Sequence, residues 1–317
     1  MIERDDLPQG AWQTLFPRAL KLVDEIEKHR GRRPFFTFGG GTVLMLRHGH
    51  RLSKDIDIFV PDPQSLGYVT PRLSDVADEL CNSQYVEASE FVKLQMPEGE
   101  IDFVASPNLL SPSDAFEEWK LFGQPVRVET AAEIVAKKMY FRGDRATARD
   151  LFDFALVAER EPDALAKCDN FMMRNLESFR ARVRTPDPQF LRQFDAIETL
   201  NYQPTFDEAS SRALHYLDAL SASLTKSQDA AHAFASAAGA TVQPVDVDRG
   251  EYCGPIVHRT ERHIVQAVGR GDVVIHEAFR LPAQIREHDA GATPVRLRYH
   301  RNEAQILSRG REGGHER

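Results

Sequence analysis

The 317-residue sequence has few cysteines, no long apolar run and no excess of basic residues. Its three cysteines, Cys81, Cys168 and Cys253, lie far apart in the chain. Such scattered cysteines argue against a disulfide framework or a zinc cluster and are typical of a reducing cytoplasm. No stretch approaches the roughly 18 apolar residues of a membrane-spanning helix, and the start, MIERDDLPQG, lacks the pattern of a signal peptide. We therefore expect a cytoplasmic protein without a membrane partner.

The composition is that of a soluble globular protein with an acidic balance. The net charge is −8, which argues against a protein that coats nucleic acid without specificity. Apolar residues make up 42% of the chain, enough to build a core. The length favours more than one domain.

Hydrophobic periodicity changes twice along the chain. Apolar residues at helical spacing predict a helix over 10–29, and the alternation in DIDIFV predicts a strand with one exposed face. Residues 90–106 predict a hairpin, 129–160 predict two helices, and the period returns to two after residue 240. We expect an α/β (α+β) core over 1–125, a helical domain over 126–235, a small mostly-β domain over 243–307 and a tail over 308–317.

The stretch FTFGGGTVLMLRHGHRLSKDIDIFV combines a glycine run with two alternating carboxylates. Glycines let backbone N–H groups approach a phosphate closely, because no side chain intervenes. In a strand, residues i and i+2 point the same way, so Asp55 and Asp57 can hold one metal between them. Mg²⁺ is a hard ion that prefers such oxygen ligands. A tight turn beside an exposed acidic strand is the simpler alternative.

A third carboxylate on a neighbouring strand commonly completes such a metal site. Asp102 lies in EIDFVA between two apolar residues and is our candidate. Glu100 shares its face of the predicted strand and remains the alternative.

A second constellation lies in EIVAKKMYFRGDRATARDLFDF, residues 133–154. Lys138 can direct a cation at a triphosphate, where it would neutralise charge on the leaving group. A solvated helix with charge pairs such as Arg149 with Asp153 is the structural alternative. Asp150 would assist deprotonation of an acceptor hydroxyl or hold Lys138 or Arg149 in place, and the sequence does not separate these roles.

These motifs together resemble the nucleotidyltransferase superfamily of the DNA polymerase β type, in which a glycine pair, a short helix and Asp-h-Asp follow one another. GGTVL and RLSKDIDIF look most like the AbiEii toxin family. The family's lysine falls on Lys138, with Lys137 one residue away, and its Arg-Asp pair on Arg149 and Asp150. The resemblance implies catalysis by Asp55, Asp57, Lys138 and Asp150, Mg²⁺ or Mn²⁺ on Asp55, Asp57 and Asp102, and NTP binding by Gly40, Gly41, Thr42, Arg51, Ser53, Lys138 and Arg149.

The last part of the chain has a resemblance of its own. GEYCGPIVHRTERHIVQAVGRGDVVIHEAFRL followed by VRLRYHRNEAQ looks like the KfrB-type domain of plasmid-encoded proteins. It implies a mobile-element setting and a docking role. A small β module that merely packs is the alternative. His48 and His50, between the glycines and Asp55, are expected to be surface residues.

The resemblance implies a nucleotidyltransferase toxin of a toxin–antitoxin or phage-defence pair, with an α/β nucleotidyltransferase core and a cognate antitoxin. It would attach a nucleotide from an NTP to an RNA acceptor, with the 3′ end of tRNA as first choice, and so block translation. Nucleotidylation of a protein or small molecule is one alternative. A non-catalytic plasmid-encoded binding protein is the other.

Overall fold

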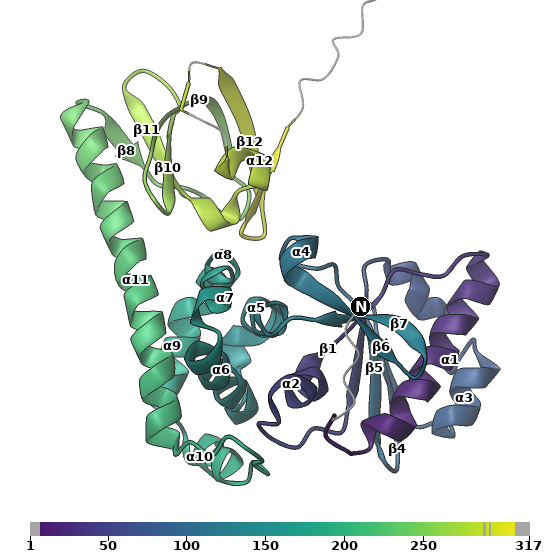
Figure 1. Cartoon of the computed structure of the whole chain (residues 1–317). Coiled ribbons are helices and arrows are strands. Elements are labelled where there is room, and N and C mark those ends of the chain that lie inside the picture. Colours follow the sequence, from purple (N-terminus) through teal and green to yellow (C-terminus); the bar gives the residue numbers. More distant parts are fainter. Residues whose placement is uncertain (1–6, 288–289, 292, 308–317) are drawn as a thin grey trace, which may run out of the picture. The chain divides into compact units, whose positions relative to one another are not determined.

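The computed structural model describes residues 7–287, 290–291 and 293–307. The expected tail, 308–317, lies outside these residues. The chain divides into two compact units, Met1–Tyr216 and Leu217–Arg317, each with its own sheet (Figure 1).

The first unit is built on a seven-stranded sheet of order β3-β4-β5-β2-β1-β7-β6. The chain runs antiparallel from β1 to β2, and β2 pairs in parallel with β5. The strands are β1 Thr37–Gly39, β2 Ile56–Val60, β3 Tyr85–Ala88, β4 Phe91–Met96, β5 Gly99–Ala105, β6 Phe116–Leu121 and β7 Gln124–Glu129. The predicted hairpin over 90–106 is confirmed as β4 and β5.

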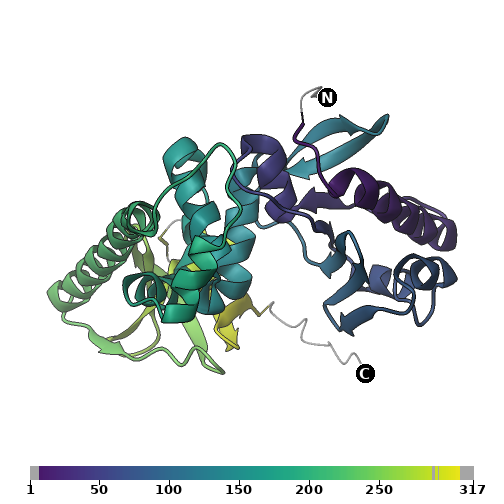
Figure 2. The ribbon, with the colours of Figure 1, turned by 90° about the horizontal axis from the view of Figure 1, so that it is seen from below.

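Apolar faces hold the helices of this core onto the sheet. The first helix, α1, buries one face against β2 and β5, where Ile56 and Ile58 are fully buried as the alternation predicted. It lies on the side of the sheet away from α5 and α6 (Figures 1 and 2). The elements are α1 Trp12–Arg30, α2 Gly40–His48, the 3₁₀ helix η1 Pro63–Tyr68, α3 Asp75–Cys81 and α4 Pro112–Ala115.

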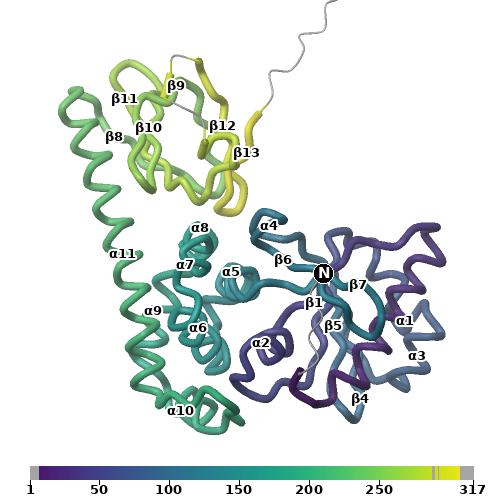
Figure 3. The backbone as a smooth tube through the Cα atoms, viewed as in Figure 1, coloured from purple at the N-terminus to yellow at the C-terminus, as the bar shows by residue number. Residues whose placement is uncertain are grey.

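The chain after β7 is helical, as the change of period predicted. Thr130 caps α5 by accepting a hydrogen bond from the Glu133 backbone N–H, and Asp187 caps α10 in the same way through Phe190. Figure 3 traces these helices, which are α5 Ala131–Arg142, η2 Gly143–Arg145, α6 Ala148–Arg160, α7 Pro162–Ala166, α8 Asp169–Met172, η3 Met173–Asn175, α9 Leu176–Arg184, α10 Pro188–Asp195 and α11 Phe206–Ala237. The two units divide within α11.

The second unit contains a six-stranded sheet of order β13-β12-β9-β10-β11-β8, which confirms the expected β domain. His276 lies buried in it, with Nδ1 2.9 Å from the Tyr299 hydroxyl and Nε2 3.0 Å from Gln266 Oε1. The elements are β8 Thr241–Gln243, β9 Glu251–Arg259, β10 His263–Ala267, β11 Asp272–Glu277, η4 Ala278–Arg280, α12 Ala283–Arg286, β12 Pro294–His300 and β13 Glu303–Ile306.

None of the helices in the described ranges is both long enough and apolar enough to cross a membrane.

Candidate active site

The glycine run forms a crowded turn between β1 and α2. Gly40 has a φ of +72°, and a Cβ on it would lie 1.8 Å from Oδ2 of Asp57. A Cβ on Gly41 would lie 2.8 Å from Nη2 of Arg51 and 3.0 Å from Oγ of Ser53. The backbone of this turn therefore passes directly against the polar side chains of the motif, and only glycine permits that approach.

Gly39 does more than end the strand. A Cβ there would lie 2.1 Å from Oε2 of Glu129, at the end of β7. Glu129 is fully buried, and this Oε2 has no hydrogen-bond partner within the described structure. Gly39 and Gly40 therefore keep space beside carboxylate oxygens, and Gly41 keeps space beside the Arg51 guanidinium and the Ser53 hydroxyl.

Thr42 connects the glycine turn to the acidic motif through a hydrogen bond. Its hydroxyl donates to the backbone carbonyl of Asp55 at 2.5 Å, and its side chain is fully buried. Because the hydroxyl is already used in this way, the group of Thr42 that could bind a phosphate is its backbone N–H, in the first turn of α2. The free N–H groups and the positive end of the dipole make a helix start a favourable place for an anion.

The acidic motif is placed by strand pairing. Asp57 on β2 lies in register with Asp102 on the parallel strand β5. Asp55 comes one residue before β2, and its Oδ1 accepts a hydrogen bond from the Glu100 backbone N–H at 3.1 Å. Asp55, Asp57 and Asp102 all line one pocket, whereas Glu100 is not among its lining residues in the described structure.

Burial and mutual repulsion raise the pKa values of two of these carboxylates, Asp57 and Asp102. Burial, with the charges of Asp102 and Asp55, raises the pKa of Asp57 to about 7. Burial also raises the pKa of Asp102 to about 6, although the Lys93 ammonium opposes the shift. A positive charge added beside these side chains would therefore stabilise their ionised form.

The carboxylates fit a divalent cation by chemistry, without forming a closed cage. Within the described residues, no three His, Cys, Asp or Glu side chains gather tightly enough to hold a metal ion. However, Oδ1 of Asp102 is buried without a hydrogen-bond partner. A cation would satisfy this oxygen and offset the burial and the repulsion that together raise the pKa values of Asp57 and Asp102.

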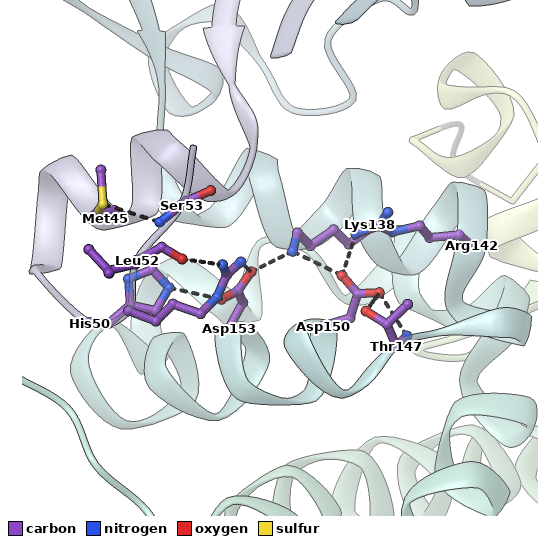
Figure 4. Close-up of polar contacts among 10 residues, drawn as sticks. Met45, His50, Leu52, Ser53, Lys138, Arg142, Thr147, Asp150 and Asp153 are labelled. Atoms are coloured by element: carbon purple, nitrogen blue, oxygen red, sulfur yellow. Dashed lines mark hydrogen bonds and ion pairs between the residues drawn. The ribbon is translucent and has the colours of Figure 1, made fainter. Parts of the chain in front are cut away.

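A chain of alternating charges connects the segment between α2 and β2 to α5 and α6 (Figure 4). Arg51 binds Asp153 through both carboxylate oxygens, at 2.7 and 2.8 Å. Lys138 Nζ lies 2.5 Å from the same carboxylate and 2.9 Å from Asp150. Arg142 completes the chain at 2.5 Å from Asp150. The Asp153 carboxylate thus holds cations from two separate sequence motifs, Arg51 from the first and Lys138 from the second.

Both carboxylate oxygens of Asp150 have hydrogen-bond or ion-pair partners. It closes a capping box at the start of α6, where its Oδ2 accepts from the Thr147 backbone N–H and hydroxyl at 2.9 Å each. The charges of Lys138 and Arg142 hold its pKa well below the usual range despite burial. This environment suits a residue that positions Lys138 more than one that accepts a proton.

Two sequence expectations are corrected here. His50 is fully buried rather than a surface residue, with Nε2 2.8 Å from Oδ1 of Asp153, and burial lowers its pKa. His48 is largely buried and pairs with Glu161 at 2.8 Å. Asp153, which helical spacing paired with Arg149, is held by Arg51 and Lys138 instead.

Sequence reasoning missed several residues of the site. Asp153 was weighed only as half of a surface pair, and Glu129 and Lys93 were not considered. Lys137, the near neighbour of Lys138, lies 2.5 Å from Glu129 and 3.8 Å from the ring centre of Phe59. The buried alternation Val-Arg-Val before Glu129 was a signal that a carboxylate ends a core strand.

Most of the candidate residues line one pocket of about 880 Å³ within the first unit, whereas Thr42 and Asp150 are not among its lining residues in the described structure. It contains the glycine turn, the three carboxylates and the cations of α5 and α6. Ser53 and Arg149 also line it, with Phe141 and Arg145 beside them. Its lining from the predicted motifs is Gly40, Gly41, Arg51, Ser53, Asp55, Asp57, Asp102, Lys138 and Arg149.

A mixed sheet whose glycine turn, paired aspartates and lysine face one pocket defines a nucleotidyltransferase. The model of the AbiEii family, described as a nucleotidyl transferase AbiEii toxin of a Type IV toxin–antitoxin system, matches residues 22–236. Because this match covers more than half of the chain, the protein belongs to the AbiEii family. The resemblance inferred from the sequence is therefore confirmed, and the chain is a nucleotidyltransferase of a toxin family.

The C-terminal resemblance is confirmed as well. A KfrB domain matches residues 251–308, which includes the strands from β9 to β13.

Two of the solved structures to which the chain is similar come from Helicobacter pylori and Mycobacterium tuberculosis. A Helicobacter pylori protein described as a nucleotidyltransferase has 18% identity and a TM-score of 0.39, over 67% of this chain and 96% of its own. MenT4, a nucleotidyltransferase toxin from Mycobacterium tuberculosis, has 17% identity and a TM-score of 0.39, over 67% of this chain and 85% of its own. No curated protein matches the chain.

Proposed function

We propose that the protein transfers a nucleotide from an NTP to a hydroxyl of an RNA acceptor, with the 3′ end of tRNA as the expected target. The acceptor oxygen attacks the α-phosphorus, the bond from that phosphorus to the bridging oxygen breaks, and pyrophosphate leaves. The observation that carries the proposal is the single pocket in which the glycine turn, the aspartates and Lys138 meet. A tRNA with a blocked 3′ end cannot be aminoacylated, so translation would stop.

The residues of the pocket have different roles in the proposed reaction. The N–H groups of Gly40, Gly41 and Thr42 would bind the phosphates at the start of α2. Lys138 would neutralise charge that develops on the leaving pyrophosphate. Asp150 and Asp153 hold Lys138 in place through the ion pairs already described.

Asp55 and Asp57 would hold Mg²⁺ or Mn²⁺, with Asp102 as the third carboxylate. Such an ion supplies positive charge at the attacked phosphorus and at the leaving group. The unpartnered Oδ1 of Asp102 supports this role.

Exposed groups at the pocket support a nucleic acid as the acceptor. Phe141 is 47% exposed and lines the pocket, as do the exposed side chains of Arg145 and Arg149. An aromatic ring beside arginines is a surface on which a base stacks while its phosphates are bound. A small neutral acceptor has neither a base to stack on the ring nor phosphates for the arginines to bind.

We propose a cognate antitoxin as the protein partner, a proposal that membership of a toxin family supports. A toxin that acts on tRNA would work in the cytoplasm, and a plasmid or phage-defence setting suits the KfrB domain.

The test is incubation of the protein with each of four α-labelled NTPs and with tRNA, total RNA or a cell proteome. We expect label from one preferred NTP on tRNA. Label that enters only protein would refute the RNA acceptor. A variant with Asp57→Ala serves as the control for catalysis by the pocket.

A further inference from the structure

Lys93 places a cation among the acidic residues of the pocket. It lies on β4, directly opposite Asp102 on β5 in the antiparallel register. Its Nζ is 3.0 Å from Oδ2 of Asp102 and 2.5 Å from Oε2 of Glu100. The side chain is 30% exposed and lines the pocket together with Asp55 and Asp57.

The two oxygens of Asp102 are therefore in different environments. Oδ2 is bound to Lys93, whereas Oδ1 is buried without a hydrogen-bond partner. A carboxylate has two oxygens, and each of them can bind a separate cation. Here one of these two positions is already filled by an ammonium group that belongs to the chain.

Glu100 fixes the ammonium group in this position. Its Oε2 binds Lys93, and its Oε1 accepts from the Gln95 side-chain amide at 3.2 Å. Glu100 lies two residues before Asp102 on the same face of β5, so both carboxylates approach Lys93 from one strand. Without Lys93, these two carboxylates would form an acidic pair open to a second divalent ion.

We propose that Lys93 takes the place of a second metal ion, so that the site binds one divalent ion with the NTP. The one ion would use Asp55, Asp57 and Oδ1 of Asp102. Lys93 would supply the remaining positive charge from the side of Oδ2. This inference rests on the proposed metal-dependent nucleotidyl transfer and assigns to Lys93 a positioning and charge-balancing role.

The experiment counts Mn²⁺ ions per bound nucleotide. Protein in excess is mixed with a non-hydrolysable NTP analogue, and free Mn²⁺ is measured by electron paramagnetic resonance during titration. The wild-type chain is expected to hold one Mn²⁺ per analogue. Lys93→Met keeps most of the stem but removes the charge, and it is expected to hold two.

Two variants control for the site of the added ion. Lys93→Arg keeps the positive charge and is expected to hold one Mn²⁺. Lys93→Met combined with Glu100→Gln removes a ligand that Lys93 had covered, so the second ion is expected to disappear. Lys93→Gln replaces Lys93→Met if the latter does not fold, as judged by its thermal unfolding.

The outcomes separate this inference from the proposed function. Two ions in the wild-type chain, or one ion in the folded Lys93→Met chain, would overturn the role of Lys93 and leave nucleotidyl transfer standing. Mn²⁺ that binds to none of the variants, together with no transfer of label, would overturn both.

Discussion

The turn at Gly40 offers the sharpest test of how the backbone builds the site. A Cβ at this position would lie 1.8 Å from Oδ2 of Asp57, and an ordinary contact begins at 3.4 Å. The Gly40→Ala change therefore forces the Asp57 carboxylate or the turn to move by about 1.6 Å. The residue also has a φ of +72°, which an alanine adopts at a cost.

The expected effects on activity and on stability differ in size. A displacement of about 1 Å in a reacting group can lower a rate by about 100-fold. We therefore expect Gly40→Ala to lower the rate of nucleotidyl transfer at least about 100-fold. The left-handed backbone costs an alanine about 1–2 kcal/mol. The chain should remain folded, because this cost lies below the stability of about 5–15 kcal/mol that is typical of a domain.

The assay measures transfer from labelled NTP and thermal unfolding in the same preparations. Gly67→Ala is the matched control, because a Cβ on Gly67 meets no atom within 4 Å. The control should keep wild-type activity. If Gly40→Ala retained activity within about twofold of wild type while folded, the close approach of the turn to Asp57 would not matter for function, and our reasoning would be refuted.

Three further substitutions test the charges of the site. Asp57 has a pKa of about 7 in the folded chain, which is above its pKa in the unfolded chain. Ionisation of Asp57 therefore lowers the free energy of unfolding progressively as the pH rises from 4 to 7. Asp57→Asn should thus abolish transfer yet stabilise the metal-free protein at pH 8 by about 4 kcal/mol, a gain that thermal unfolding should show shrinking toward pH 4. Asp153→Asn leaves Arg51 without its buried partner and should cost about 3–5 kcal/mol in urea unfolding, where a loss below 1 kcal/mol would contradict the pairing. Lys138→Met should lower kcat about 100-fold in steady-state transfer assays, and a change confined to KM would speak against transition-state stabilisation.

Much of the site could be predicted from the sequence because its motifs are local. The glycines, a short helix and two alternating aspartates follow one another within 25 residues, and their spacing determines how they meet. Strand alternation in both segments placed Asp57 and Asp102 each on the polar face of its own strand, and the register of β2 with β5 brings the two together. Lys138 could be placed because its helix lies next to a recognisable Arg-Asp motif.

The residues that sequence reasoning missed are held by contacts between distant segments. His50 and Asp153 lie 103 residues apart in the chain, yet the fold buries them together. Nothing in the local sequence distinguishes such a histidine from one on the surface. Lys93 lies in an ordinary alternating strand, and only the register of β4 with β5 brings it to Asp102.

The most direct test of the central claim is sequencing of tRNA 3′ ends from cells that produce the protein. The account predicts added nucleotides on tRNA 3′ ends when the wild-type chain is induced and growth stops. Cells that produce equal amounts of the Asp57→Ala chain should grow and keep unmodified ends. Growth arrest with unmodified tRNA ends, or modified ends with Asp57→Ala, would contradict the account.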